Sequence, residues 1–274
     1  MLSKLLKNEF IATGRIMGAL YAVVAVITAY ILGSYYFTKD TASTGQILGV
    51  TVLLLITASS FLLTTVVMIW NFQKTLYGDQ GYLSFTLPVK GSSLLTSKVL
   101  VSTLWYVIAF ACFMGSAALT AFIVKEDVIG DESYDMIQSL LPMFLGGRSM
   151  TTIVWVVVLS VIGYFVRFAV ITVELYFAIS LANTRHFQKK TVLWIIIFSL
   201  ATIGIVETIS GKISDKIDLG IGISGNELSL VTDVSTLTSG MSFINLMSII
   251  IPLVFGVIFY FLTYYVMNKK VNIR

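Results

Sequence analysis

The sequence is poor in the residues from which most active sites and metal centres are built. It has one histidine, His186, and one cysteine, Cys112, among 274 residues. A His-based triad, a site with two histidine ligands and an intrachain disulfide therefore cannot form within this chain. The HExxH, GxSxG and GxxxxGK[ST] motifs are also absent, so the chain carries no phosphate-binding loop of its own. A membrane-embedded enzyme is the least favoured interpretation, and we expect this chain to bind no metal and no cofactor.

Charged residues are scarce as well. They make up 12% of the chain, whereas hydrophobic residues make up 57%. Soluble domains carry about 25% charged residues, so this composition indicates an integral membrane protein. The net charge of +4 could suggest a nucleic-acid partner, but the basic residues lie beside the apolar runs. We therefore predict a lipid bilayer, and no nucleic acid, as the partner of these basic residues.

Six apolar runs are long enough, or nearly so, to cross a hydrocarbon core of about 30 Å as helices. They lie at residues 16–37, 47–70, 99–124, 149–182, 191–209 and 243–267. Helices are expected because backbone groups in lipid must be paired internally, and the alternating pattern of a transmembrane barrel is absent. The prediction is an all-α integral membrane protein with a single transmembrane domain over residues 1–274.

The charged residues are distributed unevenly between the two sets of loops. Twelve of the 18 Lys and Arg residues lie in the N-terminal segment, in residues 71–98 and 183–190, and in the C-terminal tail. The opposite loops, 38–46, 125–148 and 207–242, hold 11 of the 14 acidic residues. The positive-inside rule then places both termini in the cytoplasm. Loop 207–242 is long for a structureless connection, and we expect a short helix or a hairpin within it.

The first 15 residues place several apolar side chains largely on one helical face, with lysines beside them. These apolar residues are Leu2, Leu5, Leu6 and Phe10. This pattern predicts an amphipathic helix lying in the membrane interface. An ordinary basic flank that sets topology is compatible with the same residues.

Two groups of polar residues lie inside the spans. Thr57, Ser60 and Thr64 follow one face of the second span; they either pack between helices or line a translocation path. Arg167 and Glu174 are seven residues apart on nearly the same face of the fourth span. Arg167 lies about 27 Å from the outer end of that helix, near the inner interface, so it either snorkels to water or pairs with Glu174 or with a neighbouring helix.

The cytoplasmic stretch LYGDQGYLSFTLPVKGSSLLTSK, residues 76–98, interrupts the apolar runs. Gly78 breaks the preceding helix and Asp79 can cap a short helix that begins at Gln80. That helix would end before Pro88, which disfavours helical geometry at Leu87, and Ser92 or Ser93 can cap the third span. Its apolar face, with Tyr82, Leu83 and Phe85, has to cover lipid headgroups, fold back on the bundle or enter a partner's groove.

The same stretch resembles the loop between the second and third spans of permease subunits of bacterial ABC transporters of the type-two export class. The residues of this stretch are particularly similar to those of permeases of Gram-positive gut bacteria that export drugs or antimicrobial peptides. The matching positions are Asp79, Gly81, Leu83, Leu87, Pro88 and Lys98. The resemblance implies that the loop is a coupling helix seated in a separate ATPase subunit, with contacts from Asp79, Gly81, Tyr82, Leu83, Phe85, Leu87 and Pro88. It also implies ATP and Mg bound on that subunit, and a second permease subunit, identical or paralogous.

The function expected from this resemblance is that of a translocation subunit rather than an enzyme. It would export a hydrophobic or peptide-like substrate, such as a drug or an antimicrobial peptide, across the bacterial plasma membrane. The acidic outer loops slightly favour a cationic peptide as the substrate. The alternative is a non-transporting membrane sensor or assembly scaffold of a peptide-response system, because the same fold could serve either role.

Overall fold

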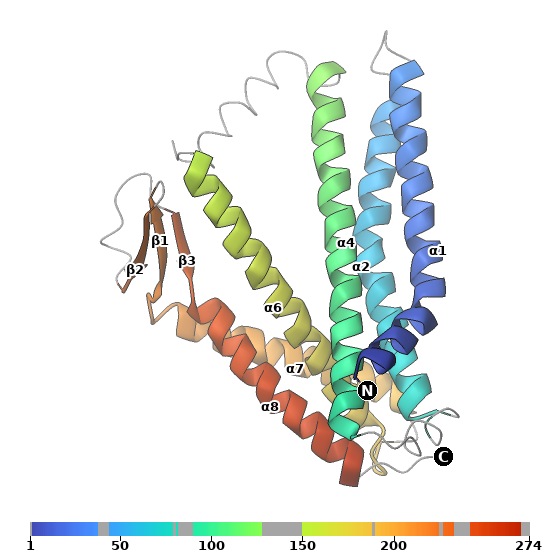
Figure 1. The fold of residues 1–274 in the computed structure, drawn as a ribbon, viewed down its shortest axis with the longest axis vertical. Helices are drawn as coiled ribbons and strands as arrows, with labels where there is room; N and C mark the ends of the chain where they lie inside the picture. The colour runs from blue at the N-terminus through green and yellow to red at the C-terminus, as the bar shows by residue number, and fades with distance from the viewer. Residues whose placement is uncertain are drawn as a thin grey trace. The chain divides into compact units, whose positions relative to one another are not determined.

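The computed structural model describes residues 2–37, 44–78, 81, 90–127, 150–187, 190–224, 227–232 and 242–269. Within these residues, six helices are long and apolar enough to span a membrane, so the prediction of a helical multi-pass membrane protein is confirmed (Figure 1). The helices are α1 (Leu2–Phe37), α2 (Thr44–Leu76), α4 (Gly91–Asp127), α6 (Met150–Ala182), α7 (Thr191–Ser214) and α8 (Met247–Lys269).

Most helices are longer than the apolar runs that predicted them. Helix α2 continues to Leu76 and ends, as expected, just before Gly78, whose N–H donates to the Gln73 carbonyl. Helix α4 begins at Gly91, so Ser92 and Ser93 lie inside the helix rather than capping it. Helix α7 continues five residues past the expected end at 209. Hydrogen bonding along the backbone carries each helix beyond the lipid-facing residues that defined its span.

Helix α1 is continuous from Leu2. In Figure 1 its first turns, in dark blue, lie at an angle to the rest of the helix. Two rings pack on Trp105 of α4 from these two parts: Phe10 stacks at a centroid distance of 4.9 Å and Tyr21 at 6.0 Å. The Trp105 indole N–H also donates to the Thr13 hydroxyl at 2.9 Å. Trp105 therefore fixes the N-terminal turns that the sequence predicted as an interfacial helix.

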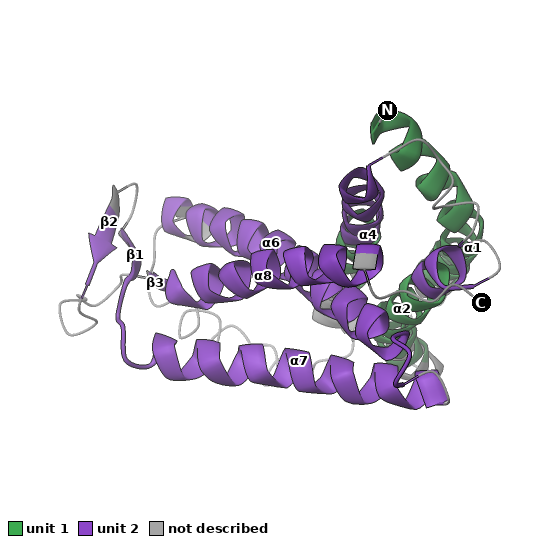
Figure 2. Ribbon diagram, turned by 90° about the horizontal axis from the view of Figure 1, so that it is seen from below, with its two compact units in different colours: residues 1–71, 104–140 green, residues 72–103, 141–274 purple. Residues whose placement is uncertain are grey.

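The chain divides into two compact units (Figure 2). Unit 1 comprises residues 1–71 and 104–140 and contains α1, most of α2 and the second part of α4. Its core includes Leu53 packed on Ile31, and the rings of Phe61 and Phe113 meet edge to face. Unit 2 comprises residues 72–103 and 141–274, and in it α6, α7 and α8 pack against one another pairwise.

Loop 207–242 contains the hairpin that was one of the two structures expected there. Strand β1 (Gly220–Ser224) pairs antiparallel with β2 (Glu227–Val231) and, on its other edge, with β3 (Ser242–Asn245). A Cβ on Gly220 would lie 2.3 Å from the Phe243 ring, so this close approach requires glycine. The sheet lies at one end of the helices of unit 2 (Figure 1).

The predicted start of the sixth span at residue 243 is wrong, because residues 242–245 form β3 instead. Asn245 ends this strand and begins α8. Its side-chain oxygen accepts the N–H of Met247 at 2.8 Å, which caps the helix. Its amide donates to the carbonyl of Ser214, the last residue of α7, at 3.1 Å. One side chain thus joins the end of α7 to the start of α8.

Candidate functional site

Most of the predicted coupling segment lies outside the described residues. This applies to Asp79, Tyr82, Leu83, Phe85, Leu87 and Pro88. Gly81 is described: it is helical and buried, and its N–H donates to the Gly78 carbonyl at 2.8 Å. The two helix ends that flank the segment are also described. They show how a segment at this position is attached to the rest of unit 2.

The first attachment is at the end of α2, where aromatic rings pack on α6. Phe72 is fully buried and stacks on Tyr176 with ring centroids 3.8 Å apart. One turn later, Tyr77 donates its hydroxyl proton to Ser180 Oγ at 2.6 Å. Burial raises the pKa of the Tyr77 phenol above its usual value, although the bond to Ser180 opposes this shift. The phenol therefore stays neutral, and it holds the end of α2 against α6.

The second attachment is at the start of α4. Lys98 is buried, and its Nζ donates to Thr75 Oγ1 of α2 at 2.7 Å. Thr96 and Tyr260 of α8 share a hydrogen bond of 2.8 Å between their hydroxyls. At Gly91, a Cβ would lie 3.2 Å from the side-chain oxygen of Asn268. The start of α4 is thus bound to the end of α2 on one side and to the end of α8 on the other.

Together these contacts lie at the two helix ends that flank residues 79–89 in the sequence, and we call them the anchored base. It consists of Phe72, Thr75, Tyr77, Thr96, Lys98, Tyr176, Ser180 and Tyr260. Sequence analysis assigned all of these helix ends to the cytoplasmic side, and they do lie together. A displacement of the end of α2 would reach α6 through the buried Tyr77–Ser180 bond and the stacked rings, because packed interiors transmit strain. A displacement of the start of α4 would reach α8 through the partly buried Thr96–Tyr260 bond.

The hydroxyls of the second span lie within unit 1. Thr57, Ser60 and Thr64 are all buried. Thr57 Oγ1 accepts a hydrogen bond from Ser116 of α4 at 3.1 Å, and Thr64 Oγ1 pairs with the Tyr21 hydroxyl of α1 at 3.1 Å. Ser60 donates to the carbonyl of Thr57 at 2.6 Å. In this conformation Thr57 and Thr64 bond between helices and Ser60 bonds within α2, and the role of the three residues in lining a path stays a prediction.

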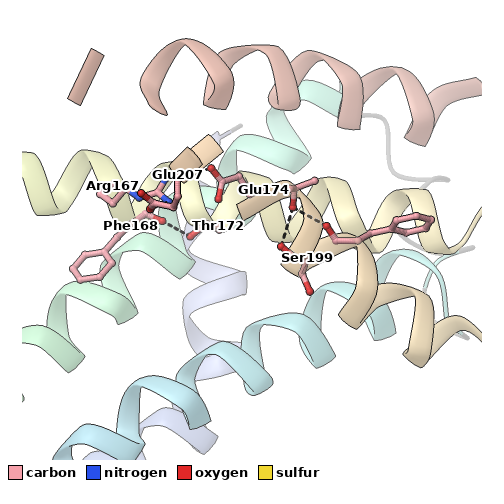
Figure 3. A network of polar contacts seen from close by, with 8 residues as sticks. Arg167, Phe168, Thr172, Glu174, Ser199 and Glu207 are labelled. Atoms are coloured by element: carbon pink, nitrogen blue, oxygen red, sulfur yellow. Dashed lines mark hydrogen bonds and ion pairs between the residues drawn. The ribbon is translucent and has the colours of Figure 1, made fainter. Parts of the chain in front are cut away.

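A charged cluster joins α6 to α7 (Figure 3). The Arg167 guanidinium lies 3.2 Å from Glu174 Oε1, so the two residues that sequence analysis singled out form an ion pair. The same guanidinium also bonds Glu207 of α7 through its second terminal nitrogen. Sequence analysis missed this partner, because Glu207 was counted with the outer loop and helical periodicity does not relate one helix to the next.

The position of Glu207 also locates Arg167 along α7. Glu207 is 16 residues along α7 from Thr191, which corresponds to about 24 Å at 1.5 Å per residue. The guanidinium therefore lies well away from the end of α7 that joins loop 183–190. The depth of Arg167 near the inner interface of a membrane stays a prediction.

Helices α6 and α8 approach closely at Gly256 and bound an apolar groove. A Cβ on Gly256 would lie 2.9 Å from Val170 Cγ2. The groove has a volume of about 470 Å³, within the range of pockets for small molecules. It is lined by Val166, Ala169, Val170, Val173, Leu253, Gly256, Val257, Tyr260 and Phe261. Because its lining is almost wholly apolar, the groove suits apolar groups but offers little to distinguish one apolar group from another.

Comparison of this chain with protein-family models, with curated proteins and with solved structures gave no match.

Proposed function

We propose that this chain is the membrane-spanning permease subunit of an ATP-driven ABC exporter, with residues 79–89 as its coupling segment. The observation that carries the proposal is the anchored base. The helix ends on both sides of this short segment are held to α6 and α8 by stacked rings, by the buried Tyr77–Ser180 bond and by the partly buried Thr96–Tyr260 bond. A simple connection between two antiparallel helices needs a few residues and no such attachment.

The sequence of the segment supports the same conclusion. It resembles the coupling loops of type-two export permeases, and its apolar side chains Tyr82, Leu83 and Phe85 suit a partner's groove. The chain has no phosphate-binding loop, so the energy for transport has to come from another subunit that binds ATP and Mg. In this mechanism the ATPase displaces residues 79–89, and α6 and α8 follow because the base couples them. A second permease subunit completes the transporter, in the plasma membrane of a bacterium.

The proposal is tested by purifying the chain with the product of the adjacent gene, expected to be the ATPase, and measuring ATP turnover in lipid vesicles. Leu83→Asp and Phe85→Asp are expected to abolish assembly of the complex, because a carboxylate cannot enter an apolar groove without a large desolvation cost. Leu230→Asp is the matched control, since Leu230 is 75% exposed on strand β2 and lies far from residue 79 along the chain. The control is expected to assemble and turn over ATP normally.

The proposal fails if Leu83→Asp and Phe85→Asp assemble with the ATPase and turn over ATP as the unmodified chain does. Export is measured on the same vesicles with a hydrophobic fluorescent drug as the probe. A complex that hydrolyses ATP without moving any probe would instead favour the sensor or scaffold role.

A further inference from the structure

The cluster of Arg167, Glu174 and Glu207 contains two carboxylates for one guanidinium. All three lie on helices that are long and apolar enough to span a membrane. When both carboxylates are ionised, the cluster carries one formal negative charge in excess. Ionisable groups within membrane spans are costly and are retained mainly at functional sites. This excess charge distinguishes the cluster from a simple neutral ion pair.

The two carboxylates differ in their surroundings. The Glu174 side chain is fully buried, whereas 59% of the Glu207 side chain is exposed. The exposed carboxylate is therefore the one that a second cation can reach.

Glu174 also has an unused acceptor. Its Oε2 atom is buried, and no described residue donates a hydrogen bond to it. Figure 3 draws two hydroxyls beside the cluster, and both donate to backbone carbonyls instead of to Glu174. Thr172 donates to the Phe168 carbonyl and Ser199 to the Ile195 carbonyl. A buried carboxylate oxygen without a donor is costly, so Oε2 is a vacant position for an N–H group.

We propose that Glu207 binds a cationic group of the transported molecule, an ammonium or a guanidinium, and that Arg167 is released to Glu174 when it does so. This inference rests on the proposed function, because it treats the ligand as the exported substrate. It assigns that substrate to the class of hydrophobic cations, which includes amphipathic amines and basic peptides.

The exchange leaves every charge paired. Arg167 now divides its two terminal nitrogens between Glu174 and Glu207. When an incoming cation takes Glu207, the guanidinium can turn to bond both oxygens of Glu174 in the bidentate geometry that arginine and carboxylate prefer. The bond to Glu207 is lost and a bond to the vacant Oε2 is gained. Arg167 is thus a positioning residue, and Glu207 is the residue that touches the ligand.

The test is equilibrium binding of radiolabelled dodecylammonium to the purified full-length chain in phosphatidylcholine nanodiscs, without any ATPase. Dodecanol, which is uncharged, measures partition into the lipid. Glu207→Gln is expected to weaken saturable binding of dodecylammonium at least about tenfold, because a hydrogen bond to a charged group is worth a factor of this order. The partition of dodecanol is expected to stay the same.

Two further variants test whether a loss of dodecylammonium binding arises from this cluster. Asp215→Asn removes the same charge from the exposed residue that caps α7 and is expected to bind as the unmodified chain does. Glu174→Gln weakens the alternative partner of Arg167, so Arg167 stays on Glu207 and dodecylammonium binding is expected to fall several-fold. Both variants, and Glu207→Gln, are first checked for an unchanged melting temperature.

The binding site is ruled out if Glu207→Gln binds dodecylammonium as tightly as the unmodified chain, or if Asp215→Asn weakens binding equally. Full affinity in Glu174→Gln overturns the exchange of Arg167. Because the assay contains no ATPase, these outcomes are independent of whether residues 79–89 couple to one.

Discussion

At the scale of single residues, Tyr77 shows how the end of α2, which precedes the proposed coupling segment, is tied to α6. Its phenol is buried and donates to Ser180 at 2.6 Å. The bond crosses from the end of α2 to α6, so it is one of the contacts through which a displacement of residues 79–89 would be transmitted. Its loss therefore affects both the stability of unit 2 and the transmission of force.

Tyr77→Phe removes this bond without changing the ring. We expect the free energy of unfolding to fall by about 1–3 kcal/mol, the cost of depriving a buried polar group of its partner. Tyr164→Phe is the matched control, because Tyr164 is 51% exposed on α6, and we expect a loss below about 0.5 kcal/mol. Unfolding by denaturant titration of the purified chain measures both values. Equal effects of the two substitutions would contradict the role of the Ser180 bond.

The pH dependence of the same variant follows from the pKa of Tyr77, which burial raises. An unfolded tyrosine loses its proton near pH 10, while the folded chain keeps it. The stability that this group contributes is complete below about pH 10 and declines as the pH rises above this value. We therefore expect the difference in stability between the unmodified chain and Tyr77→Phe to shrink above pH 10 in the same titrations.

At the scale of helices, α6 is the element that contacts most of the functional features. It carries Arg167 and Glu174, it packs on α7 and α8, and its final turns hold Tyr77. Its contact with α8 is close at Gly256, where the Val170 side chain fills the space that a Cβ would take. A larger residue at this position would therefore force the two helices apart.

Gly256→Ala is expected to destabilise the chain by about 1–3 kcal/mol, because overpacking forces the two helices apart. Adding Val170→Ala should recover most of this loss, and the double-mutant cycle gives the coupling between the two positions. Gly204→Ala on α7 is the control. An added Cβ there meets nothing within 4 Å, so we expect a gain of up to about 1 kcal/mol from helix propensity. Additive effects at Gly256 and Val170 would contradict the close contact.

At the scale of the whole molecule, the arrangement of the ends of the helices determines what each side of the membrane can bind. The charge distribution predicts that loop 183–190 is cytoplasmic and that the sheet β2–β1–β3 is external. Residues 79–89 can meet a cytoplasmic ATPase only if this orientation is correct.

Labelling with a membrane-impermeant maleimide tests the orientation on a Cys112→Ser background. Thr232→Cys and Arg185→Cys place a thiol at exposed positions next to β2 and in loop 183–190. We expect intact cells to label the cysteine at 232 and to protect the one at 185 until the membrane is permeabilised. The reverse pattern would place residues 79–89 outside the cell and exclude the proposed coupling.

The sequence predicted those features of the fold that depend on the local pattern of residues. Hydrophobic length predicted the six helices, and Gly78 predicted the end of α2. Sequence could not predict the contacts between helices, since periodicity along α6 says nothing about which residue of α7 faces Arg167. Glu207, the partners of Trp105 and the bond from Lys98 to Thr75 all depend on such packing. The residues of the coupling segment itself, apart from Gly81, lie outside the described residues, so their predicted contacts stay predictions.

The bond from Asn245 to the end of α7 has a mechanical consequence. It joins the two helices at the sheet end of unit 2, so any separation of α7 from α8 would be resisted there. Helix α8 has 23 residues and is about 34 Å long, so a tilt of only about 10° about Asn245 moves its far end by about 6 Å. Tyr260, which bonds Thr96, is 13 residues along α8 from Met247, or about 20 Å, so a displacement of Thr96 would act on α8 well away from the Asn245 attachment.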